Sequence, residues 1–317
     1  MALAVGTKLG DFTTGSWSNF QNPEFQLVSI NTARFDVTKH RATPVISDAK
    51  IGLKQLSDVL GDWKAPDNWY QRSIKERNEW DAYVEKQSGP TNQELPSYAH
   101  AVGAVYRNAD PSDIVVTAAG GLVGEVVQIW KPKQINTFET EWGFSCMGYE
   151  ISGALGMKIA KPDKDIIVFI GDGSYLLQNS DIYSSVIYDK KLIIVVCDNS
   201  GHMVINRLQL AKGGKEYLCG LKTSRASNFV EVDFAAHAKS MGAESETVTS
   251  TSELEVAFKR AKESKKTYVI AIKTHGYEWL EGTAFWESPT LEVHTSDENK
   301  KAYAEHLKGK NKQRKGV

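Results

Sequence analysis

The stretch DIIVFIGDGSYLLQNSDIYSSVIYDKKLIIVVCDNSG, residues 165–201, decides the fold. Two apolar runs within it, at 166–170 and 192–196, have the length and composition of buried strands. The segment between them, 175–188, carries apolar residues at roughly helical spacing and is expected to form one helix. A strand, a helix and a strand over this length predict a βαβ unit with two parallel strands.

The same stretch places polar groups at the carboxyl ends of both expected strands. Asp172 follows the first strand, and Asn199 and Gly201 follow the second. Open α/β sheets bind ligands at this edge, and a carboxylate, an amide oxygen and a backbone carbonyl suit Mg²⁺ or Ca²⁺. Gly173 and Ser174 begin the expected helix, whose free N–H groups favour phosphate. A phosphate–metal site is therefore predicted here, although a Gly-Asp-Gly turn by itself also fits an ordinary strand-to-helix connection.

These motifs resemble those of the thiamin diphosphate (ThDP) enzyme family. GDGS (171–174) followed by DN (198–199) is similar to the family's GDG…NN motif, with Asp198 in place of the first Asn. Longer segments resemble the branch of this family that hydrolyses a C–C bond of a trihydroxycyclohexane-1,2-dione in myo-inositol catabolism, yielding 5-deoxy-glucuronate. The resemblance runs from about Leu3 to Val293, and it is carried by GFSCMGYEISGALG (143–156), GDGSYLLQNSDI (171–182) and CDNSGHMVINRLQ (197–209).

The resemblance implies a set of cofactor-binding residues. Asp172, Asn199 and the Gly201 carbonyl would bind Mg²⁺, and Met147 would support the bent cofactor. The Ser145 carbonyl would accept a hydrogen bond from the cofactor's amino group. The whole implied set is Gly121, Leu122, Ser145, Met147, Gly171, Asp172, Gly173, Ser174, Asn199 and Gly201. No catalytic residue is assigned, because the family's activating glutamate belongs to a separate pyrimidine-binding domain that is expected outside this chain.

Several alternatives remain open from the residues themselves. Ala119–Gly124 is nearly a GxGxxG dinucleotide fingerprint, with Ala119 in the first Gly place, although no acidic residue stands at the expected distance. Met147 could instead fill a gap in the core. His202 is a weak candidate for substrate contact, and residues 210–225 are rich enough in Gly and Lys to form a mobile lid. Other functions to consider are an acetolactate synthase-like decarboxylase or carboligase, and a non-catalytic cofactor-binding subunit.

The predicted fold class is α/β, with a parallel-sheet ThDP-binding domain preceded by part of a Rossmann-like middle domain. Residues 1–60 resemble the later half of that middle domain, or could form a small independent α/β cap. Residues 61–92 are expected to be a linker with an amphipathic helix, and 93–290 the ThDP- and Mg²⁺-binding domain. The basic tail, 291–317, is expected to be solvated and disordered at 308–315. The exposed edge of a half sheet needs covering, so a partner chain, or a longer protein of which this chain is a piece, is expected. A homo-oligomer, or a partner chain that supplies the pyrimidine-binding domain, is expected as well.

The amino-acid composition indicates which kinds of molecule the chain binds. The chain has 317 residues, and 38 Lys and Arg balance 39 Asp and Glu, which argues against nucleic acid as a partner. Its three cysteines show no CxxC spacing and suit a reducing cytoplasm. No apolar run has transmembrane length. The expected substrate is therefore a small molecule, a cyclic diketone by resemblance.

Overall fold

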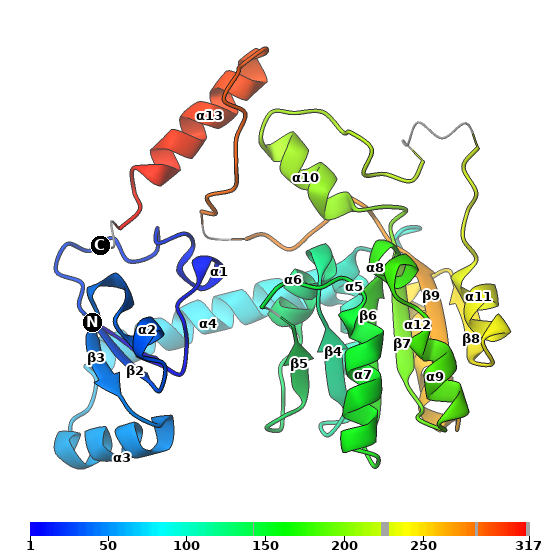
Figure 1. Ribbon diagram of the computed structural model, residues 1–317, viewed down its shortest axis with the longest axis horizontal. Coiled ribbons are helices and arrows are strands. Elements are labelled where there is room, and N and C mark those ends of the chain that lie inside the picture. The colour runs from blue at the N-terminus through cyan, green and yellow to red at the C-terminus, as the bar shows by residue number, and fades with distance from the viewer. Residues whose placement is uncertain (142, 223–227, 283–284, 315–317) are drawn as a thin grey trace. The chain divides into compact units, whose positions relative to one another are not determined.

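Figure 1 shows a computed structural model that divides into two compact units. The first comprises Met1–Ile74, Ala211–Gly214 and Glu281–Val317, and the second comprises Lys75–Leu210 and Lys215–Leu280. The residues that the structure describes are 1–141, 143–222, 228–282 and 285–314.

A six-stranded parallel sheet forms the centre of the second unit. Its strand order is β5-β4-β6-β7-β9-β8, and every neighbouring pair is parallel. The predicted α/β class and the predicted pairing of β6 with β7 are confirmed. The strands are β4 Ile114–Thr117, β5 Phe138–Thr140, β6 Ile166–Gly171, β7 Ile193–Asp198, β8 Glu244–Val248 and β9 Tyr268–Lys273.

Helices cover both faces of this sheet. Alternate residues of β6 and β7 belong to two separate buried clusters, as the pleat of a central strand requires. One cluster joins the sheet to α5, α6 and α12, and the other joins it to α7, α9 and α11. The helices are α5 Tyr98–Asn108, α6 Gly120–Ile129, α7 Tyr149–Ala160, α8 Asp172–Leu177, α9 Asp181–Ile187, α10 Met203–Ala211, α11 Phe234–Ser240 and α12 Thr251–Glu263.

Two helix predictions were wrong in detail. The single helix expected over 175–188 is two helices, because Gln178 has extended backbone angles between α8 and α9. Tyr175 and Ile182 are its buried apolar side chains, while Leu177 is exposed. Leu95-Pro96 also predicts a helix start, with proline in the first turn; the helix begins at Tyr98 instead, where the Ser97 side chain caps it.

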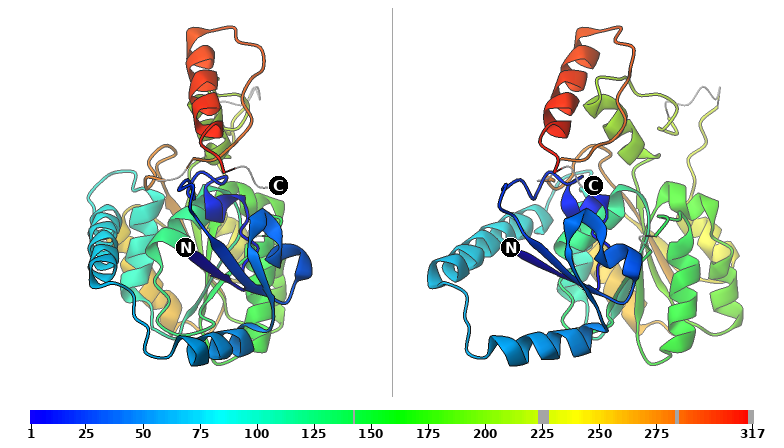
Figure 2. Two further views of the ribbon diagram at one scale, coloured as in Figure 1. Left: turned by 90° about the vertical axis from the view of Figure 1, so that its left-hand side faces the viewer. Right: turned by 60° about the vertical axis from the view of Figure 1, so that its left-hand side comes forward.

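The first unit contains a smaller parallel sheet. Its strands, β1 Ala2–Val5, β2 Leu27–Asn31 and β3 Thr43–Ile46, pair in sequence order and lie side by side in both views of Figure 2. The spacing of apolar residues over 48–60 also predicts a helix, and the structure confirms it as α3, capped by Asp48. The remaining elements are α1 Asp11–Thr14, α2 Arg34–Val37, a 3-10 turn at Lys39–Arg41, α3 Ala49–Leu60, α4 Asp67–Ser88 and α13 Asp297–Lys310.

The basic tail is ordered farther than its composition predicted. Lys308–Lys310 form the last turn of α13, and the Lys310 ammonium lies 2.8 Å from the Glu287 carboxylate. The Arg314 amide donates to the Trp17 carbonyl at 2.9 Å. The expectation of disorder is therefore wrong for 308–314, and residue 315 lies outside the described residues. None of the described helices is long and apolar enough to cross a bilayer.

Candidate functional site

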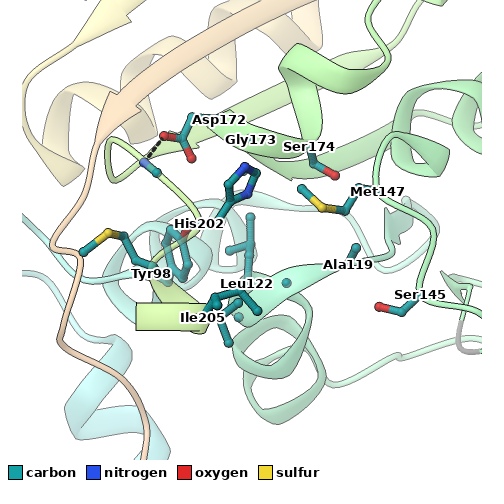
Figure 3. A pocket seen from close by; sticks show the side chains of 16 residues that line it. Tyr98, Ala119, Leu122, Ser145, Met147, Asp172, Gly173, Ser174, His202 and Ile205 are labelled. Atoms are coloured by element: carbon teal, nitrogen blue, oxygen red, sulfur yellow. Dashed lines mark hydrogen bonds between the residues drawn. The ribbon is translucent and has the colours of Figure 1, made fainter. Parts of the chain in front are cut away.

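A cavity of about 240 Å³ lies at the carboxyl ends of β6 and β7 in the second unit (Figure 3). Every residue of the expected cofactor-binding set except Asn199 lines it. The segments that meet there are far apart in sequence: the start of α6, the loop at 145–147, the turn from β6 into α8, and the turn from β7 into α10. Tyr98 and Ile205 line it as well and were not predicted from the sequence.

Asp172 is the buried carboxylate of this cavity. It is 1% exposed, and its Oδ2 accepts a hydrogen bond from the Gly201 amide at 2.7 Å, the dashed line in Figure 3. Burial, and next the neighbouring charge of Asp198, raise the pKa of Asp172 to about 7. A cation bound beside Asp172 would stabilise the charged form of this buried carboxylate.

Asn199 supplies a second oxygen close to the end of β7. Its Nδ2 donates to the Tyr98 hydroxyl at 2.7 Å. Its Oδ1 is buried and has no hydrogen-bond partner among the described residues. Leaving a buried acceptor unpaired costs free energy, so a ligand that takes this oxygen is expected. An amide oxygen, a carboxylate such as that of Asp172 and a backbone carbonyl such as that of Gly201 are the kinds of ligand that Mg²⁺ takes in proteins.

The oxygens that could bind a metal ion here come from an amide and a backbone carbonyl as well as from a carboxylate. Within residues 1–141, 143–222, 228–282 and 285–314, no group of three or more His, Cys, Asp and Glu side chains is placed to hold a metal ion. A cation at this edge would therefore depend on the amide and carbonyl oxygens as well as on Asp172.

Asp198, the residue that departs from the family motif, is balanced by Lys273. The two side chains lie 2.5 Å apart, and Lys273 also pairs with Glu231. The other oxygen of Asp198 accepts from the Ser200 amide at 2.8 Å, which shapes the turn after β7. Lys273 was not predicted from the sequence, although it directly follows an apolar run at 268–272 that has the length of a buried strand.

Glu150 ties three lining segments together. Its buried carboxylate accepts from the amides of Ala119 and Gly148 at 3.2 and 2.8 Å and from the Ser174 hydroxyl at 3.0 Å. Burial raises the pKa of Glu150 above its usual range. Glu150 was not predicted from the sequence, because its partners are up to 31 residues away.

Two glycines allow side chains to pack directly on the backbone. A Cβ on Gly173 would lie 2.5 Å from the His202 ring, and one on Gly121 would lie 3.0 Å from the Trp279 ring. Both glycines belong to helix starts that line the cavity, so a larger residue would displace these rings. His202 thereby forms part of the cavity wall.

Glu141 holds the loop before α7 through hydrogen bonds to the backbone of that loop. The Glu141 carboxylate accepts from the amides of Phe144 and Cys146 at 2.8 Å each, and these bonds lower its pKa. Met147 lines the cavity and is 37% exposed, so the alternative that it fills a gap in the core is wrong. Ser145 lies in the same loop and faces the same cavity.

The comparisons with known proteins agree with this geometry. Residues 118–272 match the family described as "Thiamine pyrophosphate enzyme, C-terminal TPP binding domain". This part of the chain is similar to the members of that family. The match includes Ala119–Gly124, which favours the ThDP interpretation of that segment over a dinucleotide site.

Relatives match nearly the whole chain. The 3D-(3,5/4)-trihydroxycyclohexane-1,2-dione hydrolase of Halalkalibacterium halodurans is 32% identical over 332 residues, covering 96% of this chain and 51% of that protein. The protein of the same name from Lacticaseibacillus casei is 33% identical over 331 residues, with the same coverage. The chain thus spans about half the length of the curated relatives it matches.

A solved structure shares the fold. The thiamine diphosphate-dependent 4-hydroxybenzoylformate decarboxylase of Rhodococcus jostii RHA1 aligns with a TM-score of 0.62 at 15% identity, covering 81% of this chain and 45% of that one. At this identity the similarity supports the fold alone.

Proposed function

We propose that the second unit binds ThDP together with Mg²⁺, and that the chain takes part in hydrolysing a C–C bond of a trihydroxycyclohexane-1,2-dione. The observation that carries this proposal is the pair of polar groups at the ends of β6 and β7: buried Asp172 and the unpartnered Oδ1 of Asn199. The named relatives, which align over 96% of the chain, support the choice of substrate.

Each residue of the expected cofactor-binding set has a proposed task. Asp172, Asn199 and the Gly201 carbonyl would hold Mg²⁺, and the backbone N–H groups that begin α6 and α8, including those of Gly121, Leu122 and Gly173, would bind the diphosphate. Gly171 and Ser174 would border the diphosphate, and Ser145 and Met147 would hold the organic rings. When bound, ThDP supplies a carbon nucleophile and an electron sink. The protein residues bind it, orient it and exclude water from it.

The proposed reaction needs more than this chain. We assign the opening of the ring to 5-deoxy-glucuronate, in myo-inositol catabolism, to an assembly that includes a pyrimidine-binding domain with the activating glutamate. That domain would come from the half of the relatives that this chain does not match, either as a partner chain or within a homo-oligomer. A cytoplasmic location is part of the proposal, since Cys146, Cys197 and Cys219 are all free thiols.

Calorimetric titration of ThDP into the chain tests the cofactor site. We expect binding in Mg²⁺ that is abolished by EDTA and by Asp172→Ala, because the diphosphate is held through the metal. Asp163→Ala, which changes an exposed aspartate of the same unit, is the matched control and should bind normally. Binding that is indifferent to both EDTA and Asp172→Ala would overturn the proposal, as would failure to bind even with a pyrimidine-binding half of a relative added.

The reaction is tested separately in that reconstituted assembly. The cyclic dione should be converted to 5-deoxy-glucuronate, followed by NMR. Release of CO₂ from pyruvate without ring opening would instead identify a decarboxylase.

A further inference from the structure

Asn199 has a carboxamide whose two ends have different surroundings. The nitrogen end donates to the Tyr98 hydroxyl at 2.7 Å, and the oxygen end is buried without a partner among the described residues. An amide can rotate by half a turn and exchange these ends. Something must therefore hold the oxygen on the side where a cation would bind, and the Tyr98 hydrogen bond is the contact that does so.

Tyr98 is itself held firmly. It begins α5 and lies inside the capping box of that helix, in which the His100 amide donates to Ser97 Oγ at 3.3 Å and the Ser97 amide donates to His100 Nδ1 at 3.2 Å. Its side chain is 5% exposed, and its ring meets the Trp279 ring edge-on with centroids 6.4 Å apart. Tyr98 also lines the cavity, as its labelled ring in Figure 3 shows.

A tyrosine hydroxyl carries its proton at neutral pH. A neutral hydroxyl can accept the Asn199 N–H without bringing a further negative charge beside Asp172 and Asp198. A phenylalanine would keep the ring and its packing and would remove only this acceptor.

We infer that Tyr98 is a positioning residue for Asn199, holding the carboxamide so that Oδ1 is presented to the metal. This inference rests on the proposed Mg²⁺ site. Partners that orient a metal ligand typically contribute about 10- to 100-fold to metal affinity. The effect should therefore appear in the Mg²⁺ requirement, whereas a merely structural residue would change stability or ThDP binding in general.

The test is a Mg²⁺ titration of ThDP binding to Tyr98→Phe, followed by calorimetry. We expect the Mg²⁺ concentration for half-maximal binding to rise about 10-fold or more, with ThDP affinity restored at saturating Mg²⁺. The matched control is Tyr106→Phe in the same helix, since the Tyr106 hydroxyl points to the Lys131 carbonyl at 3.5 Å. That variant should show the Mg²⁺ requirement of the unmodified chain.

The outcomes separate this inference from the proposed function. Mg²⁺-dependent ThDP binding by the unmodified chain, with an unchanged Mg²⁺ requirement in Tyr98→Phe, would overturn the role of Tyr98 alone. Absence of Mg²⁺-dependent binding in the unmodified chain would count against the proposed function instead.

A second measurement needs no variant to fold and bind. The side-chain NH₂ of Asn199 in the unmodified chain should exchange with solvent far more slowly than that of exposed Asn92, as read by NMR. Equal exchange of the two amides would overturn the Tyr98–Asn199 contact, whatever the chain binds.

Discussion

At the scale of single residues, charge in the candidate site is balanced locally. Asp198 places a second carboxylate beside Asp172, where two negative charges in a buried setting oppose each other. Lys273 at the end of β9 pairs with Asp198 and compensates for this extra charge. We therefore interpret the departure from the family motif as one half of a pair whose other half lies 75 residues away.

Glu125 should make stability depend on pH. It is 3% exposed in α6 and accepts from the Leu280 amide at 3.0 Å, and burial raises its pKa from 4.5 to about 7. Between these two values the folded chain holds a proton that the unfolded chain releases, so this residue lowers stability as pH rises through that window. Glu125→Gln keeps an acceptor for Leu280 and removes the titration.

The expected result is a gain of stability for Glu125→Gln over the unmodified chain of up to about 3 kcal/mol on going from about pH 4.5 to about pH 7.5. Urea unfolding at several pH values measures it. The exposed Glu85→Gln is the control. Curves for Glu125→Gln and the unmodified chain that stay parallel across the window would contradict the assignment.

At the scale of elements, close approach of backbone segments fixes where α5 lies. Gly103 is fully enclosed, and a Cβ there would overlap the Ser88 carbonyl at the end of α4. Arg107 of α5 donates to the same carbonyl at 2.7 Å. This contact matters for the site, because α5 carries Tyr98.

Gly103→Ala should therefore destabilise the second unit by about 2–4 kcal/mol, since the two segments would have to move apart. Chemical denaturation followed by circular dichroism measures this. Gly156→Ala on α7 is the matched control, because its Cβ would meet open space; it should be neutral or gain up to about 1 kcal/mol. Equal effects of the two substitutions would show that helix propensity, not packing, decides.

Lys262 of α12 joins two turns at the amino-terminal edge of the sheet. Its ammonium lies 2.8, 2.7 and 2.9 Å from the carboxylates of Asp110, Asp113 and Asp165, which precede β4 and β6. Asp113 is 3% exposed, so removing the cation would leave a buried charge without its partner.

Lys262→Met should cost about 3–5 kcal/mol of stability at neutral pH. The loss should shrink on acidification, because burial raises the pKa of Asp113 and its protonated form needs no cation beside it. Denaturation at neutral and acidic pH measures both effects, with exposed Lys259→Met of the same helix as control. A loss no larger than that of Lys259→Met would show that the cluster contributes little.

At the scale of the whole molecule, the two units have separate sheets and separate contacts. The candidate cavity is lined by the second unit alone. Differential scanning calorimetry should accordingly show two transitions, of which Mg²⁺ with ThDP raises only one, because ligand binding stabilises the folded state that binds. An upward shift of both transitions, or a single transition throughout, would contradict independent units.

The hydrophobic pattern of residues 165–201 was sufficient to predict the two parallel strands of the central βαβ unit. The strands β6 and β7 are continuous apolar runs because both faces are buried, and glycine and charge mark their ends. Asp172 and Asn199 could be placed at one edge for the same reason, since parallel strands joined by one crossover end together. The edge strands β5 and β8 were missed, because they are short or polar and carry no such run.

Only the tertiary structure decided which side chains support that edge. Tyr98, Glu150 and Lys273 reach the motif from α5, α7 and β9, and hydrogen bonds across such distances leave no periodic signal in the chain. The break between α8 and α9 was likewise decided by the tertiary structure and left no periodic signal in the sequence. The hydrophobic pattern of a sequence reflects which side of a segment is buried. The hydrogen-bond partners of its polar groups depend instead on which other segments pack beside it in the tertiary structure.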